Sequence, residues 1–226
     1  MAKSTSSSGP VTAYLVAYNL ASMASWAWIL YRTALVFLQT GDHTQVYTQV
    51  GWPLTVVQTF MLLDVVHSAL GLVRSPVLTN LVQVASRVII VWEPLQWFKT
   101  PEATTSWFLT IMICAWGITE VVRYGYYAAS LLGFQPRLLT WARYTFFYAL
   151  YPLGASSEAA IIYYSLDAAR DISSILYGIA VVEILLYFPL FPQMYLHMIK
   201  QRRKVLGGSK PVKRTRAHST PIKKKI

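Results

Sequence analysis

Six long apolar stretches constrain this chain more than any other feature of its sequence. They lie near residues 14–38, 53–73, 77–98, 106–127, 138–163 and 174–199. A helix that crosses a bilayer needs about 20 mainly apolar residues, and only structures that satisfy their own backbone hydrogen bonds are stable in lipid. The pattern therefore predicts an all-α, polytopic membrane protein, a six-helix transmembrane bundle.

Short polar turns that contain proline, glycine or charged residues separate the apolar stretches. We expect these turns at residues 41–43, 51–53, 74–76, 99–101, 133–136 and 167–173. They divide the chain into a short N-terminal segment at 1–13, a six-span transmembrane domain at 14–199 and a basic tail at 200–226.

The composition excludes a soluble globular domain, although the net charge is high. Hydrophobic residues make up 55% of the 226 residues and charged residues only 13%, which is too few to cover a soluble globule. The formal charge of +11 arises in the tail, because eleven of the twenty Lys and Arg residues, and no Asp or Glu, lie after residue 199. We therefore expect no nucleic-acid partner.

The positions of the cations predict the orientation of the chain in the membrane. Cytosolic flanks are enriched in Lys and Arg, and the basic tail, Lys3, Arg74 and Arg137 fall on one side of a six-span chain. Both termini are therefore expected in the cytosol. Lys223 and Lys224 resemble the dilysine signal that retrieves membrane proteins to the endoplasmic reticulum. A tail held at anionic lipid headgroups is the alternative.

Ionisable side chains inside the apolar stretches are costly in lipid and therefore mark functional or bracing positions. Asp64 and His67 stand three residues apart, as do Glu120 and Arg123, which puts both members of each pair on one helical face. Such pairs brace a bundle or line a polar cavity, and the spacing leaves both interpretations open.

The fifth apolar stretch carries the strongest candidate for a reactive site. Pro152 and Gly154 lie in its middle, where we expect a kink or local unwinding, which is tolerated only inside protein or beside a cavity. Tyr151 and Glu158 stand seven residues apart, two helical turns, and so share a face. A phenol and a buried carboxyl group suit acid–base chemistry on one substrate. A packed tyrosine and a hydrogen-bonded glutamate are the alternative.

The end of this stretch, Tyr-Pro-x-Gly-x-x-x-Glu at residues 151–158, resembles the signature of the very-long-chain (3R)-3-hydroxyacyl-CoA dehydratases, also called protein tyrosine phosphatase-like proteins. Further blocks in the same order extend the resemblance, at residues 82–87, 116–124, 189–198 and 201–204. The resemblance implies six helices in the endoplasmic reticulum membrane and the third step of fatty acid elongation, with Tyr151 and Glu158 catalytic. A phosphatase loop is excluded, because Glu120 stands where a Cys-x5-Arg sequence beginning at Cys114 needs arginine.

Loss of water from a 3-hydroxyacyl thioester requires one group to take the C2 proton and another to protonate the leaving hydroxyl group. We expect Glu158 to be the base and Tyr151 the acid, and the reverse assignment stays open. Arg87, Arg143 and Tyr144 are candidates to polarise the thioester carbonyl, although each also suits a structural role. No cofactor or metal is indicated, since the histidines lack ligand spacing and no glycine-rich phosphate loop is present.

The resemblance also implies partners, namely a very-long-chain 3-hydroxyacyl-CoA substrate, membrane lipid, and the condensing enzyme and reductases of the elongation cycle. We expect the coenzyme A head at the cytosolic end, near Arg137, Arg143 and residues 200–204. Two other classes stay open on the residues alone. A small transporter would also line its interior with charge, and a non-catalytic scaffold would keep the helices without needing Tyr151 or Glu158.

Overall fold

The computed structural model describes residues 9–207, and all regular structure within that range is helical. The elements follow in chain order as α1 (Gly9–Thr40), η1 (His43–Gln45), α2 (Val46–Phe60), α3 (Leu62–Ala69), α4 (Val77–Trp92), η2 (Glu93–Phe98), α5 (Pro101–Thr104), α6 (Trp107–Leu131), α7 (Arg137–Arg143), α8 (Phe147–Tyr164), α9 (Leu166–Ile172) and α10 (Ser174–Leu206). The predicted all-α class is confirmed for this range. The signal expected at Lys223 and Lys224 lies outside it.

Within residues 9–207, four helical runs are long and apolar enough to cross a membrane, as judged by length and composition. They are Gly9–Thr40, His43–Ala69, Trp107–Leu131 and Ser174–Leu206. These runs confirm a helical chain suited to a membrane. The other two expected spans correspond to α4 with the π-helical η2, and to α8. Both are shorter than the four runs above, so the number of six spans stays a prediction.

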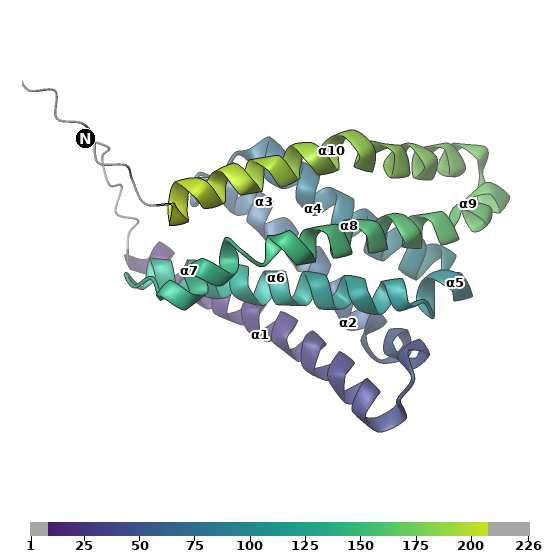
Figure 1. Ribbon diagram of the computed structural model, residues 1–226, viewed down its shortest axis with the longest axis horizontal. Coiled ribbons are helices and arrows are strands. Elements are labelled where there is room, and N and C mark those ends of the chain that lie inside the picture. The colour runs from purple at the N-terminus through teal and green to yellow at the C-terminus, as the bar shows by residue number, and fades with distance from the viewer. Residues whose placement is uncertain (1–8, 208–226) are drawn as a thin grey trace, which may run out of the picture.

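The helices run side by side along the long axis of the molecule, and α6 packs against both α1 and α8 (Figure 1). The start of α1, all of α7 and the end of α10 gather at one end, which we call the α7 end. α5 and α9 lie at the opposite end, the α9 end. The two limits of the described chain therefore lie at the same end of the bundle.

The core forms where α1 and α8 meet α6 and where α2 packs against α1 and α4. Its fully buried side chains include Trp26 of α1, Leu54 of α2, Ile113 of α6 and Ile161 of α8. At Gly117 of α6, a Cβ atom would lie 2.7 Å from the side chain of Leu30 on α1. A larger residue there would force the two helices apart, which is why small residues are favoured at close helix contacts in membranes.

Glycine and a cap make the turn between α1 and α2. Gly41 has a φ of +65°, and Asp42 accepts hydrogen bonds from the backbone N and the Oγ1 of Thr44, at 2.9 and 2.7 Å. These hydrogen bonds favour the carboxylate and hold the pKa of Asp42 below its ordinary value. The turn expected at residues 41–43 is therefore present.

The second expected break, at residues 51–53, is wrong. α2 begins at Val46 and continues through Gly51 and Pro53. Proline inside a helix leaves one carbonyl without its backbone donor, and a helix packed in a bundle tolerates that loss. The ring of Tyr47 lies against the backbone at Gly51, where a Cβ atom would approach it to 2.7 Å. Gly51 thus serves packing within the helix, and Pro53 is accommodated in it.

The fifth helix is interrupted earlier than expected. Residues 144–146 form a turn between α7 and α8, whereas Pro152 and Gly154 lie inside the continuous helix α8. Pro152 cannot donate to the carbonyl of Tyr148, four residues before it. The Tyr195 hydroxyl of α10 donates to that carbonyl in a long hydrogen bond of 3.5 Å. The unwinding expected at Pro152 is therefore wrong in position, because a neighbouring helix supplies a donor for the freed carbonyl.

Candidate active site

Glu158 of α8 is held by donors from two other helices. Nε1 of Trp116 on α6 donates to Oε1 at 2.7 Å, and the hydroxyl of Tyr187 on α10 donates to Oε2 at 2.8 Å. Both carboxyl oxygens thus accept a hydrogen bond inside the bundle, where an unsatisfied carboxyl group would be costly. The side chain of Glu158 therefore connects α8 to both α6 and α10 through hydrogen bonds.

Tyr151 lies two turns before Glu158 on α8, toward the α7 end. Its ring stacks on Phe191 of α10, with centroids 5.1 Å apart, and on Tyr195, at 6.3 Å. Within residues 9–207, the Tyr151 hydroxyl has no hydrogen-bond partner. Because contacts from α10 reach both Tyr151 and Glu158, the two residues face the same helix, and the phenol is available to a bound molecule.

Gly154 lies between these two residues on α8 and is buried against α6. A Cβ atom at this position would lie 3.6 Å from Oε1 of Glu158 and 3.8 Å from both Ala115 and Trp116. Those are ordinary van der Waals distances, so alanine fits, but any longer side chain would extend toward the carboxyl group. The absence of a side chain keeps the surface beside Oε1 uncovered.

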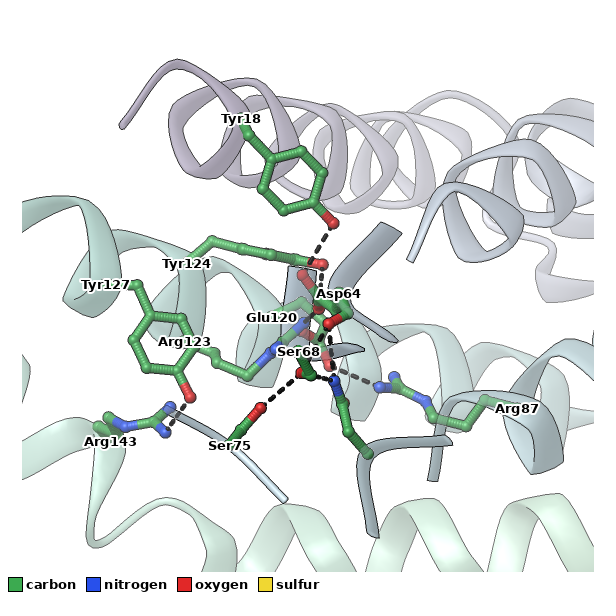
Figure 2. Close-up of polar contacts among 11 residues, drawn as sticks. Tyr18, Asp64, Ser68, Ser75, Arg87, Glu120, Arg123, Tyr124, Tyr127 and Arg143 are labelled. Carbon is green, nitrogen blue, oxygen red and sulfur yellow. Dashed lines mark hydrogen bonds and ion pairs between the residues drawn. The ribbon is translucent and has the colours of Figure 1, made fainter. Parts of the chain in front are cut away.

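Four charged side chains, Asp64, Arg87, Glu120 and Arg123, form a network of ion pairs, as Figure 2 shows. Glu120 accepts hydrogen bonds from Nη1 of Arg87 and Nε of Arg123, each at 2.5 Å. Nη2 of Arg123 also donates to Asp64 at 2.8 Å. Two carboxylates therefore neutralise two guanidinium groups, which makes this charge tolerable in the bundle. The pairing expected between Glu120 and Arg123 is present.

Asp64 and His67, both within the described range, pair with other residues and not with each other. Asp64 binds Arg123 and the hydroxyl of Tyr18, at 2.8 and 2.9 Å (Figure 2). Nε2 of His67 lies 2.8 Å from the hydroxyl of Tyr14. Partners from α1 and α6 replace the local pair that the spacing suggests. The bracing interpretation fits these contacts, since each one ties α3 to another helix.

Arg87 connects this network to Glu158 through Trp116. Its guanidinium carbon lies 4.2 Å from the centre of the Trp116 ring, close enough for a cation–π interaction. The face of the indole thus lies against a cation, while the N–H edge of the same ring donates to Glu158. Arg87, which the sequence made a candidate to polarise the thioester carbonyl, contacts Glu120 and Trp116 in the structure.

Arg143 lies at the end of α7 with Tyr144 directly after it. Nη2 of Arg143 donates to the hydroxyl of Tyr127 at 2.9 Å (Figure 2). Its guanidinium carbon lies 4.6 to 5.8 Å from the ring centres of Tyr126, Tyr127 and Tyr144. No carboxylate in the described part of the chain forms an ion pair with Arg143, so its positive charge is not neutralised there.

Trp116 and Tyr187 are site residues that were not predicted from the sequence. Trp116 belongs to a block that carried the resemblance, but nothing in the spacing assigned it to Glu158, which is 42 residues away. Tyr187 lies one turn from Phe191 and two from Tyr195 on α10. This row of aromatic residues at helical spacing is the signal that marks the face of α10 turned toward Tyr151 and Glu158.

The fold and the site define a class of protein: a helical membrane protein with a hydrogen-bonded carboxyl group and an available phenol on one face of one helix. The family model described as "Protein tyrosine phosphatase-like protein, PTPLA" matches residues 58–208. The chain is 37% identical to the human very-long-chain (3R)-3-hydroxyacyl-CoA dehydratase 2, over 90% of this chain and 84% of that protein.

Two further relatives come from distant organisms. The Caenorhabditis elegans very-long-chain (3R)-3-hydroxyacyl-CoA dehydratase hpo-8 is 39% identical over 88% of this chain and 96% of its own length. The rice dehydratase PASTICCINO 2A is 35% identical over 87% of this chain and 94% of its length. No solved structure matches the chain. The protein belongs to the protein tyrosine phosphatase-like, or PTPLA, family, in which these dehydratases fall.

Proposed function

We propose that this protein removes water from very-long-chain (3R)-3-hydroxyacyl-CoA to give the trans-2-enoyl-CoA, the third step of the fatty acid elongation cycle. The family supports the activity, since the relatives over nearly the whole chain bear this function in their names. The observation within the molecule that carries the proposal is the arrangement of Tyr151 and Glu158, which face α10 together from one helix.

Tyr151 and Glu158 form the proposed catalytic pair. The thioester carbonyl acidifies the proton on C2, and one member of the pair removes it. The electrons of the C2–H bond form the C2=C3 double bond as the C3–O bond breaks, and the other member protonates the leaving hydroxyl group to give water. One proton is taken and one is given, so the reaction balances without an oxidant or reductant. Transfer of a proton through water resets the pair.

The coenzyme A head is proposed to lie at the α7 end. Tyr151 stands on that side of Glu158, and the unneutralised guanidinium of Arg143 lies at the turn that precedes α8. Nε of Arg202 on α10 donates to Thr145 of the same turn at 3.4 Å, so two cations flank it. Guanidinium groups suit phosphate oxygens. Since Arg87 is engaged by Glu120, we assign the contact with the phosphates to Arg143 and the contact with the thioester carbonyl to Tyr144.

We further propose six crossings, with both termini in the cytosol, in the membrane of the endoplasmic reticulum. The start of α1 and the end of α10 lie together at the α7 end, where Arg137, Arg202 and Arg203 also fall (Figure 1). Lys99 and Arg170 belong to the α9 end. This asymmetry fits a cytosolic α7 end. The condensing enzyme and the reductases of the elongation cycle are the proposed protein partners, and lipid surrounds the exposed apolar face of α10.

The test of the activity is turnover by the purified protein in lipid vesicles. Long-chain (3R)-3-hydroxyacyl-CoA should be converted to the trans-2-enoyl-CoA, and the (3S) epimer should be converted far more slowly. Product is followed by the absorbance of the conjugated thioester and identified by mass spectrometry. A folded protein that releases no enoyl-CoA would contradict the proposal and favour a scaffold.

A further inference from the structure

The hydrogen bonds at Glu158 bear on which member of the catalytic pair is the base. An indole N–H only donates, so Oε1 must act as an acceptor toward Trp116. The Tyr187 hydroxyl donates to Oε2. Two donors from neighbouring helices on one carboxyl group form the arrangement that orients a carboxylate. The lone pairs that remain on each oxygen can still take a proton from a substrate.

The donor at Oε1 is itself fixed by groups that lie outside the site. Arg87 packs on the face of Trp116 at 4.2 Å and is held in turn by Glu120. Figure 2 shows that Arg87 reaches Glu120 from a different helix. Trp116 and Glu120 stand four residues apart on α6, so one helical face presents both the donor and the carboxylate that anchors its cation. The indole is therefore oriented before any substrate arrives.

Tyr151 differs from Glu158 in its hydrogen bonding. Its hydroxyl has no partner in residues 9–207, whereas the carboxyl group of Glu158 has two donors. A phenol without a partner keeps its proton available for the oxygen of a bound substrate.

We infer that Trp116 and Tyr187 are positioning residues that hold Glu158 as the carboxylate base, which leaves Tyr151 as the acid. The inference rests on the proposed catalytic pair. In the reaction, Glu158 takes the proton from C2, the C2=C3 double bond forms as the C3–O bond breaks, and the Tyr151 proton completes the departing water. Of the proposed catalytic pair, Trp116 and Tyr187 form hydrogen bonds only with Glu158 and act through it.

The test compares Tyr187→Phe and Trp116→Phe with the wild type in the dehydration assay across a range of pH. Loss of one hydrogen bond to a charged group should lower kcat about ten-fold or more, with little change in KM. The low-pH limb of the kcat profile, where activity appears as the base loses its proton, should move to higher pH because the carboxylate has lost a donor. The high-pH limb should stay in place.

The matched controls change the same two residue types, one tyrosine and one tryptophan, at positions that do not contact Glu158. Tyr177→Phe removes a phenol oxygen from α10 beside Arg170, far along the helix from Tyr187. Trp92→Phe removes an indole that donates to Thr59 at 3.0 Å. Both control proteins should keep the wild-type kcat and pH profile. Tyr187→Phe removes a single oxygen and keeps the ring, so it carries the test even where Trp116→Phe is unstable.

Three outcomes would overturn the inference. A Tyr187→Phe protein with wild-type kcat and an unmoved low-pH limb would show that Tyr187 does not position the base. Movement of the high-pH limb alone would make Glu158 the acid. Glu158→Gln is measured in the same assay to separate the two claims. If Glu158→Gln is inactive while Tyr187→Phe turns over normally, only the positioning role is refuted. Wild-type turnover by Glu158→Gln would instead refute the catalytic pair itself.

Discussion

Asp64 on α3 and Arg123 on α6 form an ion pair with 2.8 Å between Oδ2 and Nη2, across 59 residues of chain. The same guanidinium binds Glu120 through Nε. Trp116, Glu120 and Arg123 follow one another at steps of four and three residues, so they lie along one face of α6. The contact with Asp64 therefore fixes the rotation of the helix that presents Trp116 to Glu158.

Removal of the central carboxylate of this network should destabilise the protein. Glu120→Gln leaves both Arg87 and Arg123 without their shared anion, and the Glu120 side chain is only 2% exposed. The loss of one partner of a buried pair costs about 3–5 kcal/mol. Thermal unfolding in detergent should show a clear fall in the midpoint. Glu102→Gln, an exposed change on α5, is the control and should unfold as the wild type does. Equal midpoints would mean that the network does not brace the bundle.

The uncovered surface at Gly154 predicts a graded response to side-chain size. Gly154→Ala adds a methyl group at ordinary contact distance from Oε1 of Glu158 and should keep the fold and much of the turnover. Gly154→Leu must displace either the carboxyl group or α6, at about 1–3 kcal/mol of overpacking, and should lose nearly all turnover. Activity is measured on protein that elutes as a single species from a sizing column. Similar turnover by both variants would contradict the assigned role of Gly154.

The charge of Arg143 predicts an effect that depends on the substrate phosphates. Arg143→Gln should raise KM for the coenzyme A thioester about ten-fold, in line with the loss of a charge-assisted hydrogen bond, and leave kcat nearly unchanged. A pantetheine thioester without the nucleotide should show no difference between Arg143→Gln and the wild type. Arg170→Gln at the α9 end is the control. If Arg143→Gln raised KM equally for the coenzyme A and the pantetheine thioesters, the phosphates would not be the partner of Arg143.

The six-span topology predicts which loops a membrane-impermeant thiol reagent reaches. In a Cys114→Ser background, a cysteine placed at Gln135, in the loop before α7, should be labelled in sealed microsomes. A cysteine placed at Glu102 on α5 should be labelled only after the membrane is permeabilised. Labelling of both positions in sealed microsomes would show that α6 does not separate them across the bilayer.

Local sequence patterns were sufficient for the helical class and for placing Tyr151 and Glu158 on one helical face, whereas their catalytic role came from the family resemblance and stays a prediction. Apolar stretches of membrane length and the seven-residue step from Tyr151 to Glu158 are properties of one segment each. The partners of Glu158 depend on how α6, α8 and α10 pack, so no local pattern identified Trp116 or Tyr187. The continuity of α8 through Pro152 also depends on packing, because Tyr195 supplies a donor for the carbonyl that Pro152 leaves free.

The same limit explains the two misplaced expectations in the first half of the chain. Asp64 and His67 have the spacing of a local pair, but Arg123 and Tyr14 compete for them from other helices. Gly51 and Pro53 have the composition of a turn, yet they lie in α2, where Gly51 admits the ring of Tyr47. In the first case contacts between residues distant in sequence outweighed the local preference, and in the second a packing contact between residues four apart in the same helix did.

The central claim is that a carboxylate inside the membrane domain removes the C2 proton, and the turnover of folded Glu158→Gln tests it most directly. This change keeps the size of the side chain and can still accept one hydrogen bond, but it cannot act as a base. A general base contributes about 10²- to 10⁴-fold to a reaction of this kind. We predict a loss of kcat in that range for Glu158→Gln, with Glu102→Gln at the wild-type rate. A Glu158→Gln protein with wild-type kcat would contradict the account.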